Sequence, residues 1–256
     1  MRKIVIIILC LGSILGCKKK KTDDNTTTTT VQPPSNNPSN PVTDIFIPAD
    51  ADGVLRASEI PYEFSNNYVT RLGKASAFFY TSPGDFNYVD AGAVQGNDSV
   101  LSKLSGAYYF GGKPINGQPK SGINYSGGST WTVTGTASVP SFTFANTSFP
   151  TMASLTSGTL ISKSVAYNMS YGGVVNADSV VVILSGDSTA VQKKTVVTSA
   201  GGCTFTPAEL GKVKKVGTGN FPYINITSYN IVVNTVSTKK YYVINSNTST
   251  YRVNIY

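Results

Sequence analysis

The stretch Asp178-Ser-Val-Val-Val-Ile-Leu-Ser-Gly186 decides the fold class of this chain. Its centre, from Val180 to Leu184, is a continuous apolar run between two pairs of turn-forming residues. A short run that is rich in β-branched side chains is typical of a strand buried on both faces. The stretch therefore predicts a central strand of a β-sheet.

Three other segments alternate apolar and polar residues, which is the pattern of a strand with one solvent-facing side. Their apolar positions are Val165, Tyr167, Met169 and Tyr171; Trp131 and Val133; and Tyr251, Val253 and Ile255. Turns that contain glycine or proline, such as Ser82-Pro83-Gly84-Asp85, separate the predicted strands at short intervals. Only one helical turn is predicted, from Thr206 to Gly211, because Thr-Pro-Ala-Glu supplies an N-cap, a first-position proline and a capping glutamate.

Composition agrees with an all-β fold, since the chain has 15 Tyr, 11 Phe and 24 Gly but only 13% charged residues. A domain boundary is predicted near Phe149-Pro150, which divides the folded part into residues 45–150 and 151–256. Each half has the size of a common β-sandwich. We therefore expect two consecutive antiparallel β-sandwich lobes.

The C-terminal half resembles the immunoglobulin-like or fibronectin III-like domains of Bacteroidota surface lipoproteins. The resemblance rests on the strands predicted above and on the strand-to-turn step Gly202-Cys203-Thr204-Phe205-Thr206-Pro207. The Cys-Trp-Cys core of antibody domains is missing from the sequence, which excludes a true antibody-type domain. The N-terminal half resembles the companion lobe of lipoproteins from the same phylum, and this resemblance implies no activity.

The first residues predict export and a lipid anchor. Arg2 and Lys3 precede an apolar run from Ile4 to Leu15, which ends at Gly16-Cys17 and has the architecture of a secretory signal. The run is shorter than the roughly 20 residues of a transmembrane helix. Residues 1–16 resemble a bacterial lipoprotein signal, which implies that Cys17 is lipidated and begins the mature chain. Ordinary secretion, with Cys17 as a plain thiol, is the alternative.

Residues 17–44 predict a disordered linker, because they consist mainly of Lys, Thr, Asn, Ser and Pro and have little apolar surface to bury. The linker begins with Lys18 to Lys21, Thr22 and Asp23-Asp24. This run resembles the surface-export signal of Bacteroidota lipoproteins, although Thr22 interrupts the pattern, and a plain solvated charge run is the alternative. The expected location is the outer membrane, with the folded part at the cell surface.

The residues available for chemistry favour a protein that is not an enzyme. The sequence has no histidine, which excludes Ser-His-Asp and Cys-His catalysis and histidine metal sites. Cys203 is the one cysteine outside the signal and the lipidation position, and we predict that it is a buried, inert thiol.

Asp50-Ala51-Asp52-Gly53 has the spacing of a calcium loop but lacks its other ligands, so we expect a turn there, no metal and no cofactor. A glycoside hydrolase that uses two carboxylates is the remaining enzymatic alternative, with Glu59, Glu63 and Glu209 as its glutamates.

Adjacent aromatic residues predict a binding platform. Neighbouring residues of a strand point to opposite faces, so in Phe78-Phe79-Tyr80, Tyr108-Tyr109 and Tyr241-Tyr242 one ring of each group can lie in the core and another can face outward. Outward tyrosines stack on sugars or anchor protein partners. The platform hypothesis therefore names Tyr80, Tyr109 and Tyr242, and packing of the outward rings under a loop is the alternative.

Three Asp-Ser-Val or Asp-Ser-Thr triplets resemble the O-glycosylation signal of Bacteroidota. The hydroxyl residues of these triplets are Ser99, Ser179 and Ser188. A turn followed by a strand has the same local sequence, so both interpretations stay open.

Three classes of function remain. The leading one is a non-catalytic surface lipoprotein that is held at the membrane by its lipid and binds or presents a glycan or another envelope protein. The second is a fimbrial or adhesive subunit, for which we expect proteolytic processing after Arg56. The third is the hydrolase named above. No nucleic-acid partner is expected, because loss of Arg2 and Lys3 with the signal lowers the net charge from +8 to +6 and four of the remaining charges are Lys18 to Lys21.

Overall fold

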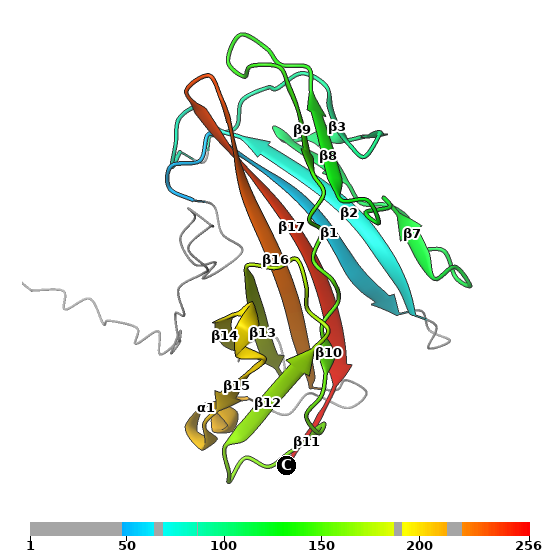
Figure 1. Cartoon of the computed structure of the whole chain (residues 1–256), viewed down its shortest axis with the longest axis vertical. Helices are drawn as coiled ribbons and strands as arrows, with labels where there is room; N and C mark the ends of the chain where they lie inside the picture. Colours follow the sequence, from blue (N-terminus) through cyan, green and yellow to red (C-terminus); the bar gives the residue numbers. More distant parts are fainter. Residues whose placement is uncertain (1–47, 64–68, 86, 187–190, 214–221) are drawn as a thin grey trace, which may run out of the picture.

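The computed structural model describes residues 48–63, 69–85, 87–186, 191–213 and 222–256. Within these ranges the protein is built from strands in several sheets, with one short α-helix, α1 (Pro207–Lys212), and one 3-10 turn, η1 (Thr198–Ala200) (Figure 1). The prediction of an all-β protein is confirmed.

One nine-stranded sheet runs through the length of the molecule (Figure 1). In order across the sheet, its strands are β14 (Val191–Val197), β13 (Ser179–Ser185), β16 (Tyr223–Val236), β17 (Lys239–Arg252), β1 (Gly53–Glu63), β2 (Val69–Phe79), β6 (Ala107–Phe110) and β5 (Ser102–Leu104), with β7 (Lys120–Gly122) beside the start of β2. The central hairpin, β16–β17, has 14 residues in each strand and reaches from one end of the sheet to the other. Its length makes it the common support of both halves of the chain.

Three small sheets complete the described fold. They are β4 (Ser99–Val100), β3 (Val94–Gly96), β8 (Ser129–Val133) and β9 (Phe142–Asn146); β10 (Ser154–Leu155), β12 (Tyr167–Gly172) and β15 (Gly202–Phe205); and β11 (Leu160–Ile161) with β18 (Asn254–Ile255).

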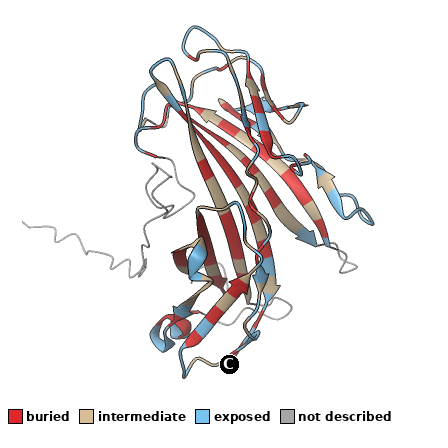
Figure 2. Cartoon of the chain, in the orientation of Figure 1, coloured by how far each residue is buried: buried red, intermediate tan, exposed pale blue. Residues whose placement is uncertain are grey.

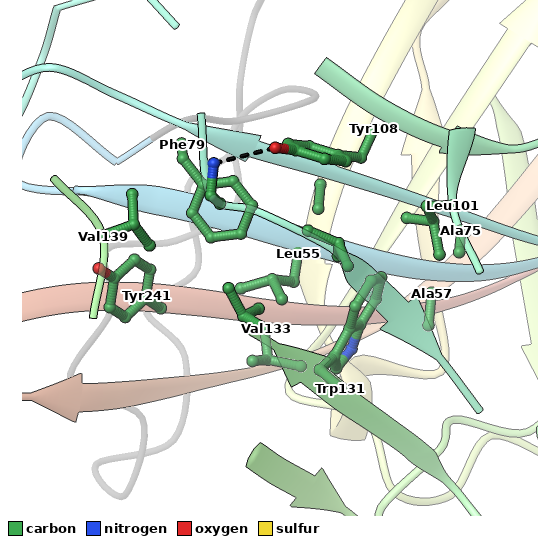
Figure 3. Packing of buried hydrophobic residues seen from close by; sticks show 14 of the residues in the cluster. Leu55, Ala57, Ala75, Phe79, Leu101, Tyr108, Trp131, Val133, Val139 and Tyr241 are labelled. Atoms are coloured by element: carbon green, nitrogen blue, oxygen red, sulfur yellow. Dashed lines mark hydrogen bonds between the residues drawn. The ribbon is translucent and has the colours of Figure 1, made fainter. Parts of the chain in front are cut away.

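The first core lies between the β8 sheet and the large sheet. Trp131 of β8 is fully buried and packs with residues such as Leu55 of β1 and Phe79 of β2 (Figure 3). Two residues of β17, Tyr241 and Val243, belong to the same core. The N-terminal half therefore completes its core with side chains from the C-terminal end of the chain.

The second core lies between the β12 sheet and the other end of the large sheet. Tyr167, Met169 and Tyr171 of β12 are buried against Val180 and Leu184 of β13. The buried strand predicted for β13 is confirmed. The predicted alternation is confirmed from Tyr167 onward, whereas Val165 lies before β12 and is exposed. Figure 2 shows buried residues along most of the large sheet and exposed residues mainly in the loops.

The large sheet is mixed rather than purely antiparallel, which corrects one part of the fold prediction. β1 pairs with β17 in parallel, with Gly53 opposite Tyr241, and pairs with β2 antiparallel. The two halves of the chain thus share one sheet. The division into residues 45–150 and 151–256 stays a prediction, since a shared sheet does not by itself decide whether each part folds alone.

The connection between the two halves, residues 147–153, crosses the large sheet without pairing to it as a strand. Side chains of β17 bind its backbone oxygens instead: Asn245 donates to Ser148 O at 3.2 Å and Asn247 to Pro150 O at 3.1 Å. Ser249 donates its hydroxyl to Ala153 O at 2.6 Å. These donors are buried, so the polar stretch of β17 replaces a backbone ladder in holding the connection.

The helix α1 begins with the predicted capping box and extends one residue past Gly211. The hydroxyl oxygen of Thr206 accepts a hydrogen bond from the backbone amide of Glu209. In return, the Oε2 atom of Glu209 accepts a hydrogen bond from the backbone amide of Thr206 at 2.8 Å. The other carboxylate oxygen of Glu209 accepts a hydrogen bond from Lys194 of β14, and both side chains are about nine-tenths buried. This ion pair attaches the helix to the edge of the large sheet.

Candidate functional site

An aromatic cluster covers one end of the large sheet, on the face opposite the first core. Phe78 lies at its centre, with the ring centroids of Tyr88 and Tyr109 at 5.8 and 5.7 Å. Tyr80 packs against Tyr88 at 5.9 Å. We call Phe78, Tyr80, Tyr88 and Tyr109 the aromatic face.

Strand pairing explains why these rings meet. Phe78 is opposite Val54 in the β1–β2 pair, and Val54 is opposite Tyr242 in the β1–β17 pair. Cross-strand neighbours share one face of a sheet, so alternate residues of three strands form a single apolar surface. Ile231 and Ile244 extend this buried support along the central hairpin.

The exposed rings of the aromatic face are Tyr88 and Tyr109, which are 41% and 40% exposed. Tyr109 meets Phe78 edge-on at 85°, which fixes its orientation. The predicted platform is therefore partly corrected: Tyr109 faces outward, whereas Tyr80 and Tyr242 are buried beneath the surface and support it. Tyr88 is the second exposed ring of this surface. Strand patterns did not predict it, because Tyr88 joins the sheet only through an isolated bridge to Tyr80.

Charged groups flank the aromatic face. The Arg56 guanidinium carbon lies 5.7 Å from the centre of the Phe78 ring, and burial lowers the pKa of Arg56 although nearby tyrosines oppose this. At the support, Tyr242 donates to Asp50 at 2.7 Å and Lys240 donates to the same carboxylate at 2.8 Å. The hydrogen bonds from Lys240 and Tyr242 lower the pKa of Asp50. Asp50 thus orders the turn before β1, as the interpretation of Asp50-Ala51-Asp52-Gly53 as a turn expects.

A groove of about 440 Å³ lies on the opposite face of the large sheet, between the two halves. Its lining is Glu59, Arg71, Lys120, Tyr125, Ser126, Thr147, Phe149, Pro150, Thr151, Met152, Asn176 and Asn247. These residues come from strands β1, β2, β7 and β17, from the connection between the halves, and from the β7–β8 and β12–β13 loops. Local sequence patterns did not predict this groove, because it forms only where the connection crosses β17.

Two charged side chains of the groove lie close together, of which Glu59 is buried and Arg71 is half-buried. Arg71 donates to Thr248 O at 2.6 Å, to Glu59 O at 3.0 Å and to the side chain of Asn247. Burial lowers the pKa of Arg71, while the charge of Glu59 acts in the opposite direction. The Glu59 carboxylate lies 3.5 Å from Lys120, an exposed residue. Arg71 is thus held in place by the backbone, and Glu59 faces the groove.

The glutamates predicted for a hydrolase lie in different places. Glu209 forms the ion pair with Lys194, Glu63 pairs with Arg252, and Glu59 lies in the groove. Glu59 is the one carboxylate in the described lining of the groove. A sugar-cleaving mechanism needs two carboxylates across the bond, so this groove does not supply that pair. Among the described residues there is also no group of three side chains suited to a metal ion.

The modification candidates have different environments. Ser99 is half-buried in the short strand β4. Ser179 is buried between β14 and β16, so its modification would have to precede folding. Ser188 and Cys17 lie outside the described residues. Cys203 is a free thiol in β15, and burial raises its pKa to about 12, which keeps it protonated at neutral pH.

No helix in the part of the chain that the structure describes has the length and apolar character needed to cross a membrane. Comparisons with protein-family models, with curated proteins and with solved structures find no match to this chain.

Proposed function

We propose that this protein is a lipid-anchored surface protein that binds glycans through its aromatic face and catalyses no reaction. The observation that supports this proposal is the pair of outward rings, Tyr88 and Tyr109, that flank the buried ring of Phe78. The whole proposal rests on this surface and on the lipoprotein-like signal that ends at Cys17.

The aromatic face has the features that sugar recognition needs. A pyranose ring has an apolar side of C–H groups that packs on the flat surface of an aromatic ring, and tyrosine adds a hydroxyl that can bond to the sugar. The rings of Tyr88 and Tyr109 are held by contacts with Phe78, so little side-chain entropy is lost on binding.

The anchor and the Ig-like lobe belong to the same proposal. Lipidated Cys17 and the linker of residues 17–44 hold the folded part away from the outer membrane, at the cell surface. The packing of β12 and β15 over β13 and β16 supports an Ig-like or fibronectin III-like sandwich for residues 151–256. In this arrangement the C-terminal half is a support and the N-terminal half carries the binding surface.

Binding to a glycan array tests the proposed ligand class. We expect Tyr88→Ala and Tyr109→Ala each to weaken binding about fivefold to tenfold, since each removes a stacking ring. Tyr256→Ala removes an exposed tyrosine at the chain end and is the matched control. An array without any bound glycan would reject the ligand class, and binding to a purified envelope protein through the same tyrosines would favour a protein partner.

Mass spectrometry of the native protein tests the anchor. We expect a mature chain that begins at acylated Cys17, and we expect Cys17→Ser to release the protein from membranes. Protease added to intact cells should digest the folded part, because the proposal places it outside the cell. A mature chain without acyl groups would refute the anchor.

A fimbrial or adhesive subunit is the second candidate, and the position of β1 favours it. Gly53 to Arg56 lie between β17 and β2 in the middle of the large sheet. Cleavage after Arg56 would remove this part of β1 and open a slot for a strand from another subunit. A mature chain that begins at Ala57 would support this candidate over the anchored binding protein.

A further inference from the structure

The groove between the two halves has a buried carboxylate, Glu59, in its lining. The Glu59 side chain is 9% exposed, and its Oε1 atom lies 3.5 Å from the Nζ atom of Lys120. Among the described residues, no hydrogen bond reaches the second carboxylate oxygen, Oε2. The Oε2 atom is not one of the buried atoms that lack a partner, so it is open to solvent and can accept a hydrogen bond from a ligand.

The remaining charges limit what this ligand is. Arg71 stays close to Glu59 because two backbone oxygens and Asn247 hold its guanidinium. A cationic ligand would meet the positive charges of Arg71 and Lys120, and an anionic ligand would meet Glu59. The charge balance therefore favours a neutral ligand with several hydroxyl groups.

The wall of the groove favours a ring-shaped ligand. The rings of Tyr125 and Phe149 are stacked, with centroids 4.8 Å apart and planes at 6°. Tyr125 is the buried member and donates its hydroxyl to Lys74 O at 2.7 Å, whereas Phe149 is only partly buried. Phe149 therefore presents a ring that is fixed from behind, and such a ring packs well on the C–H side of a sugar.

We propose that this groove binds one neutral pyranose unit, with sugar hydroxyls donating to Glu59 and the sugar ring packed on Phe149. Lys120 and Asn176, both exposed at the rim, supply donors to the sugar oxygens. The volume of about 440 Å³ lies at the lower end of the range of small-molecule sites, about 300–1,000 Å³. The groove therefore has room for a small ligand rather than for a long chain.

This proposal deepens the proposed function, because it adds a second saccharide site on the other face of the sheet. Leu55 and Ala57 lie on the same face as Glu59, whereas Val54 and Arg56 face the aromatic cluster. The two sites share no residue, so sugar binding at one site can be tested, and rejected, independently of sugar binding at the other.

Saturation-transfer NMR on the full chain in detergent tests the groove. The probes are the methyl glycosides of glucose, galactose and mannose, with methylammonium and acetate as the charged comparisons. We expect transfer to at least one glycoside, and we expect Glu59→Gln to weaken its binding about tenfold or more, because a hydrogen bond to a charged group is lost.

Ser126→Trp gives a second route that keeps Glu59 intact. Ser126 is an exposed residue of the lining, so a tryptophan there should fill the groove and abolish transfer while the protein stays folded. Ser138→Trp places the same bulk at an exposed serine outside the groove and should leave transfer unchanged.

The proposal is wrong if no glycoside shows transfer, if Ser126→Trp has no effect, or if methylammonium or acetate binds in the groove in place of the glycosides. Tyr109→Ala separates this result from the proposed function. Transfer that survives Tyr109→Ala but is lost in Ser126→Trp assigns the binding to the groove, even if the glycan array shows no binding at the aromatic face.

Discussion

The ion pair between Lys194 and Glu209 gives the sharpest test of the fold, because both side chains are almost completely removed from water, with exposed fractions of 6% and 10%. We expect Lys194→Met to destabilise the protein strongly. The substitution removes the cation but leaves the Glu209 carboxylate buried, with only the hydrogen bonds from Thr206. Breaking a buried pair in this way costs about 3–5 kcal/mol, whereas an exposed pair contributes about 0–1 kcal/mol.

Urea unfolding at neutral pH measures this cost. For a folded part of this size, a decrease of about 3 kcal/mol in the free energy of unfolding corresponds to a fall in melting temperature of about 6–12 °C. The double variant Lys194→Met/Glu209→Leu should recover much of the loss, because it leaves no charge buried. Lys212→Met removes an exposed lysine near the end of α1 and is the control. A cost for Lys194→Met below about 1 kcal/mol would refute the burial of the pair.

The pH dependence gives an independent check of the same pair. Burial raises the pKa of Glu209, but the hydrogen bonds from Lys194 and Thr206 outweigh it, so the pKa in the folded protein is lower than usual. The pair therefore stabilises the protein above the ordinary glutamate pKa, and this contribution is lost as the pH falls through the lowered value. Without Lys194 only the hydrogen bonds from Thr206 oppose the effect of burial. The pKa of Glu209 should then be higher than in the unchanged protein, so the loss of stability in Lys194→Met should shrink in acid as Glu209 takes up a proton.

Three further predictions concern packing and domain organisation. Gly73→Ala should cost about 1–3 kcal/mol in urea unfolding, because a Cβ atom there would lie 1.8 Å from the backbone oxygen of Ile123; an unchanged midpoint would contradict this close approach. Asn247→Ala should cost about 1–3 kcal/mol, since it leaves the buried Pro150 oxygen without its donor; a thermal melt equal to that of the unchanged protein would count against the role of Asn247. A fragment of residues 151–256 should aggregate in gel filtration, because the part of β17 that lies in the first core would be exposed; a monomeric, folded fragment would instead support two independent domains.

Local sequence patterns predicted the strands whose burial follows a simple period. Trp131 and Val133 alternate with polar residues and are buried, and the run from Val180 to Leu184 is a strand inside the sheet. The capping box at Thr206 was predictable for the same reason, since its signal lies within four residues.

The shared sheet and the groove were not predictable from local patterns, and the aromatic face was predictable only in part, through Tyr109. The parallel pair of β1 and β17 joins Gly53 to Tyr241, and no local signal relates residues so far apart in sequence. Much of β17 is polar because Asn245 and Asn247 face the connection between the halves, so the apolar period that predicts strands is interrupted there. The aromatic face and the groove are consequences of this long-range pairing.

The place of β17 in both cores also determines the order in which the chain can fold. β1 and β2 are synthesised well before β17, which is the parallel partner of β1. A growing chain keeps one edge of β1 unpaired until residues 239–252 are available, so the first core cannot close before then. The N-terminal half therefore stays open to chaperones until β17 has been made, and then both halves can close together.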